Sequence, residues 1–188
     1  MSYLNRDEIA ALGFVTAGED VRISARASIY GAERIAIGNH VRIDDFCILS
    51  AGEGGIEIGS YVHIAAYASI MGAERVTMGD YSGLSSRVSV YSSSDDYSGR
   101  TMTNPTVPDK YRAVDSQPIE IGRHVIVGAG SVILPGVTLG EGSAVGALSL
   151  VIMSCEPFSF ISGAPARMRR SRERGLLDLE AQFHQAKL

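Results

Sequence analysis

The sequence of 188 residues contains no tryptophan and only two cysteines, Cys47 and Cys155. Neither cysteine belongs to a CxxC pair, so two reduced thiols are expected rather than a disulfide or a thiolate metal site. No apolar run is long enough to span a bilayer, and no signal-peptide core opens the chain, so we expect a cytoplasmic protein. The formal net charge of −4 argues against a general nucleic-acid surface.

What the sequence does contain is a six-residue repeat of aliphatic side chains, often followed by a small residue. An α-helix or an alternating hairpin sheet does not produce this period, whereas a parallel β-helix does. The repeated positions are Ile23, Ile29, Ile35; Ile37, Ile43, Leu49; Ile58, Ile64, Ile70; Met78, Leu84, Val90; and Ile121, Val127, Ile133, Leu139, Val145, Val151.

The physical origin of the repeat predicts an all-β fold. Each hexapeptide forms one short strand and one corner, and three of them close a triangular coil of about eighteen residues. The aliphatic residue points inward and stacks on its equivalent one coil away. Because a coil buries its side chains only by stacking on another coil, stability is approximately a sum over neighbouring coils.

The repeat also predicts how the chain is organised. Residues 1–20 read as a lead-in with a short helix that Asn5 and Glu8 cap and Gly13 ends. The β-helix is expected over 21–155, interrupted by an excursion loop over about 91–118, and such long loops are usually functional or disordered. Residues 156–188 are expected to leave the coil and to end in a helix. One face of that helix carries Leu176, Leu179 and Phe183, which we expect to pack on the coil or on a neighbouring subunit.

Two segments carry a family resemblance, IEIGRHVIVGAGSVILPGVTLGEGSAVGALSLV and EPFSFISGAPARMRRSR. They resemble the C-terminal half of the hexapeptide-repeat acyltransferases, and are most similar to the galactoside, maltose and polysaccharide O-acetyltransferases. The resemblance implies a left-handed β-helix, an exception to the usual right-handed crossover. It also implies a homotrimer with active sites between adjacent prisms, and acetyl-CoA or another acyl-CoA as donor.

The resemblance further implies where acyl-CoA binds. Small residues let the thin pantetheine arm lie against the backbone, and those implied here are Gly128, Ala129, Gly146 and Ala147. Arg167 and Arg170 match the basic tail motif near the nucleotide end of CoA, where they would meet phosphates.

The sequence departs from the family at the catalytic histidine. In the galactoside and maltose enzymes this residue follows the strand that corresponds to residues 89–91, but here the segment over 92–97 reads SSSDDY. A hydroxyl acceptor needs a general base, which usually contributes about 10²–10⁴-fold. Either another residue serves, or the acceptor is an amine. The candidate catalytic residues are His124, His63, Asp95 and Asp96, and we expect the two aspartates to face an intersubunit cleft together with His124 from the same or a neighbouring chain.

Two other functions remain open on the residues alone. One is a non-catalytic β-helix subunit or binding protein. The other is a zinc enzyme of the γ-carbonic anhydrase type, which needs three protein ligands on one metal. His40, His63 and His124 lie on different coils without a close second histidine, so no metal site is expected. The function expected most is acyl-CoA-dependent O- or N-acetyl transfer to a sugar, nucleotide-sugar or polysaccharide precursor.

Overall fold

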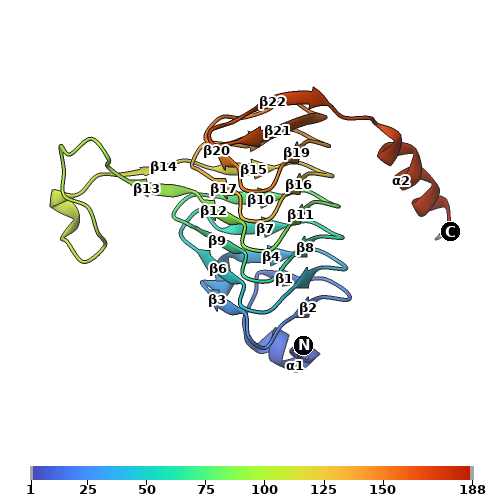
Figure 1. The fold of residues 1–188 in the computed structure, drawn as a ribbon. Helices are drawn as coiled ribbons and strands as arrows, with labels where there is room; N and C mark the ends of the chain where they lie inside the picture. Colours follow the sequence, from blue (N-terminus) through green and yellow to red (C-terminus); the bar gives the residue numbers. More distant parts are fainter. Residues whose placement is uncertain (1, 187–188) are drawn as a thin grey trace.

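A computed structural model describes residues 2–186 of the protein. The chain winds into a stack of coils whose strands form three parallel faces, with a hairpin projecting from one side and a helix lying along another (Figure 1). This arrangement confirms the parallel β-helix predicted from the six-residue repeat.

Each of the three faces is a ladder to which successive coils add one strand. The first face contains β1 (Thr16–Ala17), β4 (Ile35–Ile37), β7 (Ile56–Ile58), β10 (Val76–Met78), β15 (Ile119–Ile121) and β18 (Thr138–Leu139). The second contains β2 (Arg22–Ile23), β5 (Arg42–Ile43), β8 (His63–Ile64), β11 (Gly83–Leu84), β16 (Ile126–Val127), β19 (Ala144–Val145), β21 (Ser159–Gly163) and β22 (Ala166–Ser171). The third contains β3 (Ser28–Tyr30), β6 (Ile48–Ala51), β9 (Ser69–Gly72), β12 (Ser89–Tyr91), β17 (Val132–Ile133) and β20 (Leu150–Val151).

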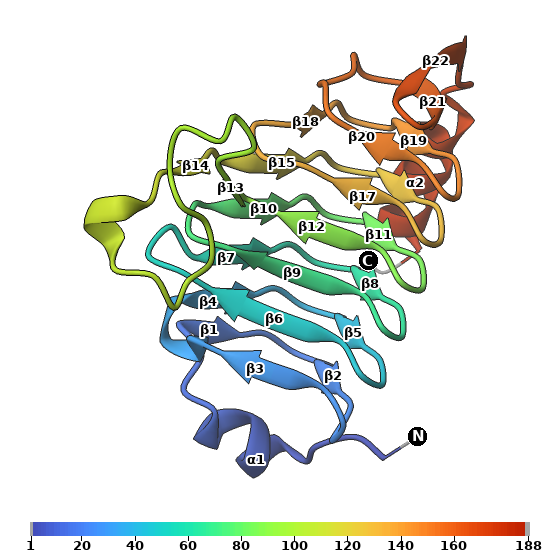
Figure 2. The ribbon, with the colours of Figure 1, turned by 60° about the vertical axis from the view of Figure 1, so that its left-hand side comes forward.

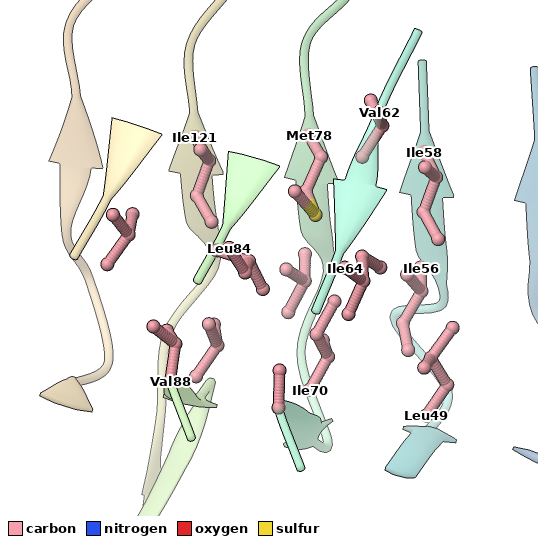
Figure 3. Packing of buried hydrophobic residues seen from close by; sticks show 14 of the residues in the cluster. Leu49, Ile56, Ile58, Val62, Ile64, Ile70, Met78, Leu84, Val88 and Ile121 are labelled. Carbon is pink, nitrogen blue, oxygen red and sulfur yellow. The ribbon is translucent and has the colours of Figure 1, made fainter. Parts of the chain in front are cut away.

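The core is a set of aliphatic rows that run through the coils. In the second face the inward row is Ile23, Ile43, Ile64, Leu84, Val127 and Val145, all at most 3 % exposed. Each residue in this row pairs in register with the next. Figure 3 shows labelled side chains of the three faces meeting inside the coil. Burial of one such side chain contributes about 1.5–3 kcal/mol, so the stacked rows hold the fold together.

The coils differ in length, and the difference lies at one corner. Inward residues of the first and second faces are always six apart, as in Ile37 and Ile43, and so are those of the second and third. From the third face back to the first, the step from Leu49 to Ile58 is longer, whereas Ile133 to Leu139 is again six. The coils before the excursion therefore have twenty or twenty-one residues instead of about eighteen, because extra turn residues, including the 3-10 turn η1 (Ala32–Arg34), sit at this corner.

The coil is longer at both ends than residues 21–155. At the start, β1 already pairs with β4. At the end, β21 stacks on β19, with Ile161 in register with Val145 and only 5 % exposed. Residues 156–172 therefore do not leave the coil at once, since Ile161 supplies one more inward side chain. The chain then folds back as β22, antiparallel to β21.

Two helices flank the coil. Helix α1 (Arg6–Ala11) has the predicted cap: Asn5 Oδ1 accepts from Glu8 N at 2.9 Å, and Asn5 N donates to Glu8 Oε2 at 2.7 Å. Helix α2 (Gly175–Gln185) follows β22. Of the predicted apolar face, Phe183 packs on the coil with its ring 5.5 Å from that of Tyr61, whereas Leu179 is 65 % exposed in the single chain. Glu180 of the same helix is buried.

The excursion between the third and first faces is a hairpin. Strand β13 (Ser93–Asp95) pairs antiparallel with β14 (Val114–Ser116), and the 3-10 turn η2 (Asp109–Tyr111) lies in its distal loop. Gln117 N donates to Ser92 O at 3.0 Å and closes the base of the hairpin. Both ribbon views show the loop projecting from the side of the coil away from α2 (Figures 1 and 2).

The stacking rows predict a sharp contrast between two leucines. Leu49→Ala should lower the free energy of unfolding by about 2–5 kcal/mol, because Leu49 is fully buried and its removal leaves a cavity. Leu179→Ala is the matched control and should change it by less than about 0.5 kcal/mol. Urea denaturation at one protein concentration measures both. Equal losses in the two variants would contradict the assignment of the core.

Candidate active site

The corner between the second and third faces brings together most of the residues predicted to bind the cofactor. Strands β5, β8, β11, β16 and β19 each end at this corner, and each is followed by two outward residues. Backbone hydrogen bonds of 2.9–3.1 Å join successive coils here: Tyr67 N to Asp45 O, Arg87 N to Ala66 O, Gly130 N to Ser86 O, and Leu148 N to Ala129 O. We call this corner the donor corner, after the acyl donor whose binding residues were predicted here, and define it by the two outward residues that follow each of the five strands. The first of each pair forms one column along the stack of coils, and the second forms another.

The predicted cofactor residues occupy the upper part of the donor corner. Gly128 and Gly146 belong to the first column, and Ala129 and Ala147 to the second. A Cβ placed on Gly128 would lie 2.5 Å from Ala147 N, so only glycine fits where these coils touch. Because these residues have small side chains or none, a thin ligand can lie directly against the backbone of this corner.

Below these positions the same columns contain residues that belong to none of the family motifs. The first column continues downward through Ser85, Ala65 and Asp44, because Ala65 N donates to Leu84 O and Asp44 N to Ile64 O. Ser85 and Ser86 are half-buried. The six-residue register aligns all of these residues with Gly128 and Gly146, so the repeat itself is the signal that could have found them.

The two predicted arginines lie on β22, at the end of the stack that continues the second face. Arg167 and Arg170 are exposed. The Arg170 guanidinium lies over the Phe160 ring at 5.3 Å, and Arg167 Nη1 donates to the carbonyl of its neighbour Ala166 at 3.0 Å. Within residues 2–186 neither arginine pairs with a carboxylate, so both charges remain available to an anionic ligand.

The two loop aspartates differ in what they do. Asp96 holds the hairpin loop: its carboxylate accepts from Ser98 N at 2.8 Å and from both the backbone N and the hydroxyl of Thr101, at 3.2 and 3.1 Å. The hydrogen bonds from Ser98 and Thr101 lower the pKa of Asp96 to about 2. Asp95 lies on β13 opposite Val114 and is half-buried. Asp96 thus serves as a turn residue, while the Asp95 carboxylate is not used in this way.

His124 lies at a different corner, between the first and second faces. Its ring stacks on Tyr81 at 4.9 Å, and its Nε2 is 2.8 Å from Oε2 of Glu180, on α2. The His124 side chain is only 10 % exposed. Burial lowers its pKa, and the nearby Arg123 guanidinium, which also pairs with Glu180, acts in the same direction. The described contacts of His124 therefore join α2 to the coil.

His63, the other predicted base, lies on β8 in the second face. Its Nε2 is 2.8 Å from Oδ2 of Asp44, and its side chain is 48 % exposed. Across residues 2–186, no hydrogen bond or ion pair joins Asp95 or Asp96 to either histidine within the single chain. The predicted meeting of these aspartates with His124 stays a prediction about neighbouring subunits.

Two further observations concern metals and membranes. Among residues 2–186, no three His, Cys, Asp or Glu side chains gather closely enough to hold a metal ion. In the same range, neither helix is long and apolar enough to cross a bilayer.

Comparison with known proteins identifies the family. Residues 118–152 match the model described as bacterial transferase hexapeptide, six repeats. The dTDP-4-amino-4,6-dideoxy-D-glucose acyltransferase of Escherichia coli is 52 % identical over 183 residues, which cover 97 % of this chain and 95 % of that protein. This chain belongs to the hexapeptide-repeat acyltransferases. The family confirms the resemblance and makes the chain an enzyme rather than a non-catalytic subunit.

Solved structures of this acyltransferase family extend the comparison. AntD, an N-acyltransferase from Bacillus cereus crystallised with dTDP and 3-hydroxybutyryl-CoA, is 43 % identical, with a TM-score of 0.95 over 99 % of this chain and 98 % of AntD.

A shorter sequence match is the putative lipopolysaccharide biosynthesis O-acetyl transferase WbbJ of Escherichia coli K12, 36 % identical over 67 residues. These cover 36 % of this chain and 34 % of WbbJ.

The contacts of Glu180 predict that it fixes α2 to the coil. Glu180→Ala removes the carboxylate that Arg123, His124 and His184 share, and hydrogen bonds to charged groups contribute about 1.5–3 kcal/mol each. Backbone amides of α2 should therefore exchange with deuterium at least about tenfold faster. Gln182→Ala, an exposed position on the same helix, should leave the exchange unchanged. Unaltered exchange in Glu180→Ala would contradict this role.

Proposed function

We propose that this chain transfers an acyl group from acyl-CoA to the amino group of a dTDP-linked 4-amino-4,6-dideoxyhexose. The observation that carries the proposal is the 52 % identity to the Escherichia coli dTDP-4-amino-4,6-dideoxy-D-glucose acyltransferase along almost the whole of both chains. AntD supports it, since that protein has been crystallised both with dTDP and 3-hydroxybutyryl-CoA and, as a variant, with dTDP-4-amino-4,6-dideoxyglucose and coenzyme A.

An amine acceptor also fits the missing loop histidine. A neutral amine attacks the thioester carbonyl through its own lone pair, whereas a hydroxyl needs a base to become a good nucleophile. A C–N bond forms, the C–S bond breaks, and the nitrogen loses one proton while CoA leaves as its thiol. The segment over 92–97, which is rich in serine and aspartate, can hold an amine without a histidine.

The donor corner supports a place for CoA. In this proposal the pantetheine arm lies along Gly128, Ala129, Gly146 and Ala147, and Arg167 and Arg170 meet the phosphates. Acetyl-CoA is the donor that we propose, because acetyl transfer is what the family resemblance implies. The product would be an amidated nucleotide-sugar of the kind that serves as a polysaccharide precursor.

We also propose a homotrimer. Large apolar side chains are exposed near the donor corner and the adjoining face, including Leu148 at 77 %, Met168 at 53 % and Ile126 at 51 %. Clusters of exposed apolar residues mark association surfaces, and identical chains associate with closed symmetry. Light scattering should give three times the chain mass of 20.0 kDa.

The acceptor site is proposed to include Ser85 and Asp95. AntD has been crystallised as variants of one aspartate and of one serine that lie ten residues apart. Along this chain only two serine–aspartate pairs have that spacing, Ser85 with Asp95 and Ser86 with Asp96. Asp96 is committed to the turn with Ser98 and Thr101. This leaves Ser85 and Asp95 as the pair that is free to contact a sugar.

The transfer itself is directly testable. The purified chain, given acetyl-CoA and dTDP-4-amino-4,6-dideoxyglucose, should release CoA thiol and form the N-acetyl sugar nucleotide, detected by mass spectrometry. The matching 4-hydroxy sugar nucleotide should release thiol at least about 100-fold more slowly, because a neutral hydroxyl is a much weaker nucleophile than a neutral amine until a base removes its proton. If the chain accepts 3-hydroxybutyryl-CoA but not acetyl-CoA as donor, the acetyl assignment fails while the N-acyltransferase assignment stands. Faster transfer to the hydroxyl sugar would overturn the proposal.

The neighbouring aspartates should separate binding from folding. Asp95→Asn should lower kcat/KM for the amino sugar by about 10- to 150-fold, as expected for a lost hydrogen bond to a charged group. Asp96→Asn should lower the melting temperature, because it weakens the turn, and should change kcat/KM less than Asp95→Asn. Steady-state kinetics and thermal unfolding of both variants check this. The reverse order of kinetic effects would reject Asp95.

A further inference from the structure

A buried carboxylate beside the donor corner has two positively chargeable partners. The Asp44 side chain is 7 % exposed. Its Oδ1 accepts from Arg42 Nε at 2.7 Å, its Oδ2 accepts from Arg42 Nη2 at 3.0 Å, and Oδ2 is also 2.8 Å from His63 Nε2. Burial alone would raise the pKa of Asp44, but the hydrogen bonds from Arg42 and His63 outweigh it and keep the pKa below its ordinary value. The carboxylate is therefore ionised at neutral pH.

The ionised carboxylate determines which nitrogen of His63 is free. A carboxylate only accepts hydrogen bonds, so Nε2 of His63 must carry the proton that it shares with Asp44. The other nitrogen, Nδ1, is then an acceptor in the neutral imidazole. Within residues 2–186 no hydrogen bond of Nδ1 is found, and the side chain is about half exposed. His63 is thus oriented as a proton acceptor toward something outside the single chain.

The β-helix register places this histidine beside the proposed acceptor site. His63 pairs with Gly83 on the next coil, and Ser85 follows Gly83 by two residues. A Cβ added to Gly83 would touch only the carbonyl oxygen of His63, at 3.4 Å, so the surface above His63 is open. Asp44 itself lies in the same column as Ser85, two coils below.

We propose that His63, held by Asp44, takes the proton that the sugar amine loses during acyl transfer. The inference rests on the proposed function. As the amine nitrogen bonds to the thioester carbonyl carbon, its proton passes to Nδ1 of His63. When the C–S bond breaks, the imidazolium returns the proton to the departing sulfur, so CoA leaves as its thiol. His63 is then the catalytic residue, and Asp44 is a positioning residue that fixes the tautomer and stabilises the imidazolium.

His63→Gln tests the proton transfer, and the chain contains a matched control. His40 forms a similar pair with Asp20, with Nδ1 3.3 Å from Oδ2, at the corner between the first and second faces. His63→Gln should lower kcat at least about tenfold, with a smaller change in KM. This loss is smaller than the roughly 10²–10⁴-fold contribution of a general base to a hydroxyl acceptor, because the amine attacks through its own lone pair. His40→Gln should change kcat less than about threefold. Circular dichroism and thermal unfolding verify that both variants fold, and added imidazole should restore part of the activity of His63→Gln only.

Asp44→Asn tests the positioning role through the split between kcat and KM. Asp44 and Arg42, both from the coil below, are the charged groups that contact or pair with His63, while β11 above it contributes Gly83 at this register. Without the carboxylate the tautomer of His63 is no longer fixed, so kcat should fall at least about tenfold with a smaller change in KM. A purely structural ion pair would alter stability and leave kcat in place. Asp20→Asn is the control and should leave kcat in place as well.

The possible outcomes separate the two proposals. If the wild-type chain acylates no amino sugar nucleotide, the proposed function fails and this inference falls with it. If the wild type is active and His63→Gln is folded and within about threefold of it across the pH range, the proton-acceptor role alone is overturned.

Discussion

The outward side chains of the coil are placed by the stacking of the inward ones. Ile43, Ile64 and Leu84 lie in one buried row, and this row fixes the height and the angle at which each coil passes over the one below. Because a strand residue that points inward forces its neighbours outward, the core register also aligns the two columns of the donor corner. The site is thus a consequence of the core rather than an addition to it.

The same constraint explains what the sequence made predictable. Inward positions repeat, so their side chains, their burial and the place where the repeat fails over 91–118 follow from spacing alone. The contact of Asp44 with His63 joins residues nineteen apart that belong to no common motif, and it emerges only when coil is laid over coil. A repeat of eighteen residues, applied to coils of twenty or twenty-one, would have put these two side chains out of register.

Helix α2 shows a second limit of sequence reasoning. An amphipathic stripe usually faces a core, and on that ground the sequence predicts that Leu176, Leu179 and Phe183 pack on the coil or on a neighbouring subunit. Phe183 does pack on Tyr61 of the coil. The coil, however, presents Arg123 and His124 where α2 meets it, so a carboxylate, Glu180, is the complementary residue to bury. A buried charge is stable only with partners, and those partners lie more than fifty residues away in the sequence. The Leu179 side chain is left on the outside of the helix.

The corner between the third and first faces varies in its number of residues from coil to coil, whereas the other two corners keep a constant number. Its step ranges from six residues, between Ile133 and Leu139, to the whole excursion between Val90 and Ile121. Successive coils rise by about 4.8 Å whatever the length of this corner. One edge of the molecule is therefore open to insertion and replacement, and the other two keep fixed spacing. Evolution can replace the segment between β12 and β15, and with it the side chains that the loop offers to an acceptor. Such a replacement leaves the two columns of the donor corner in place. The fold in this way separates the part that diversifies from the part that must stay constant.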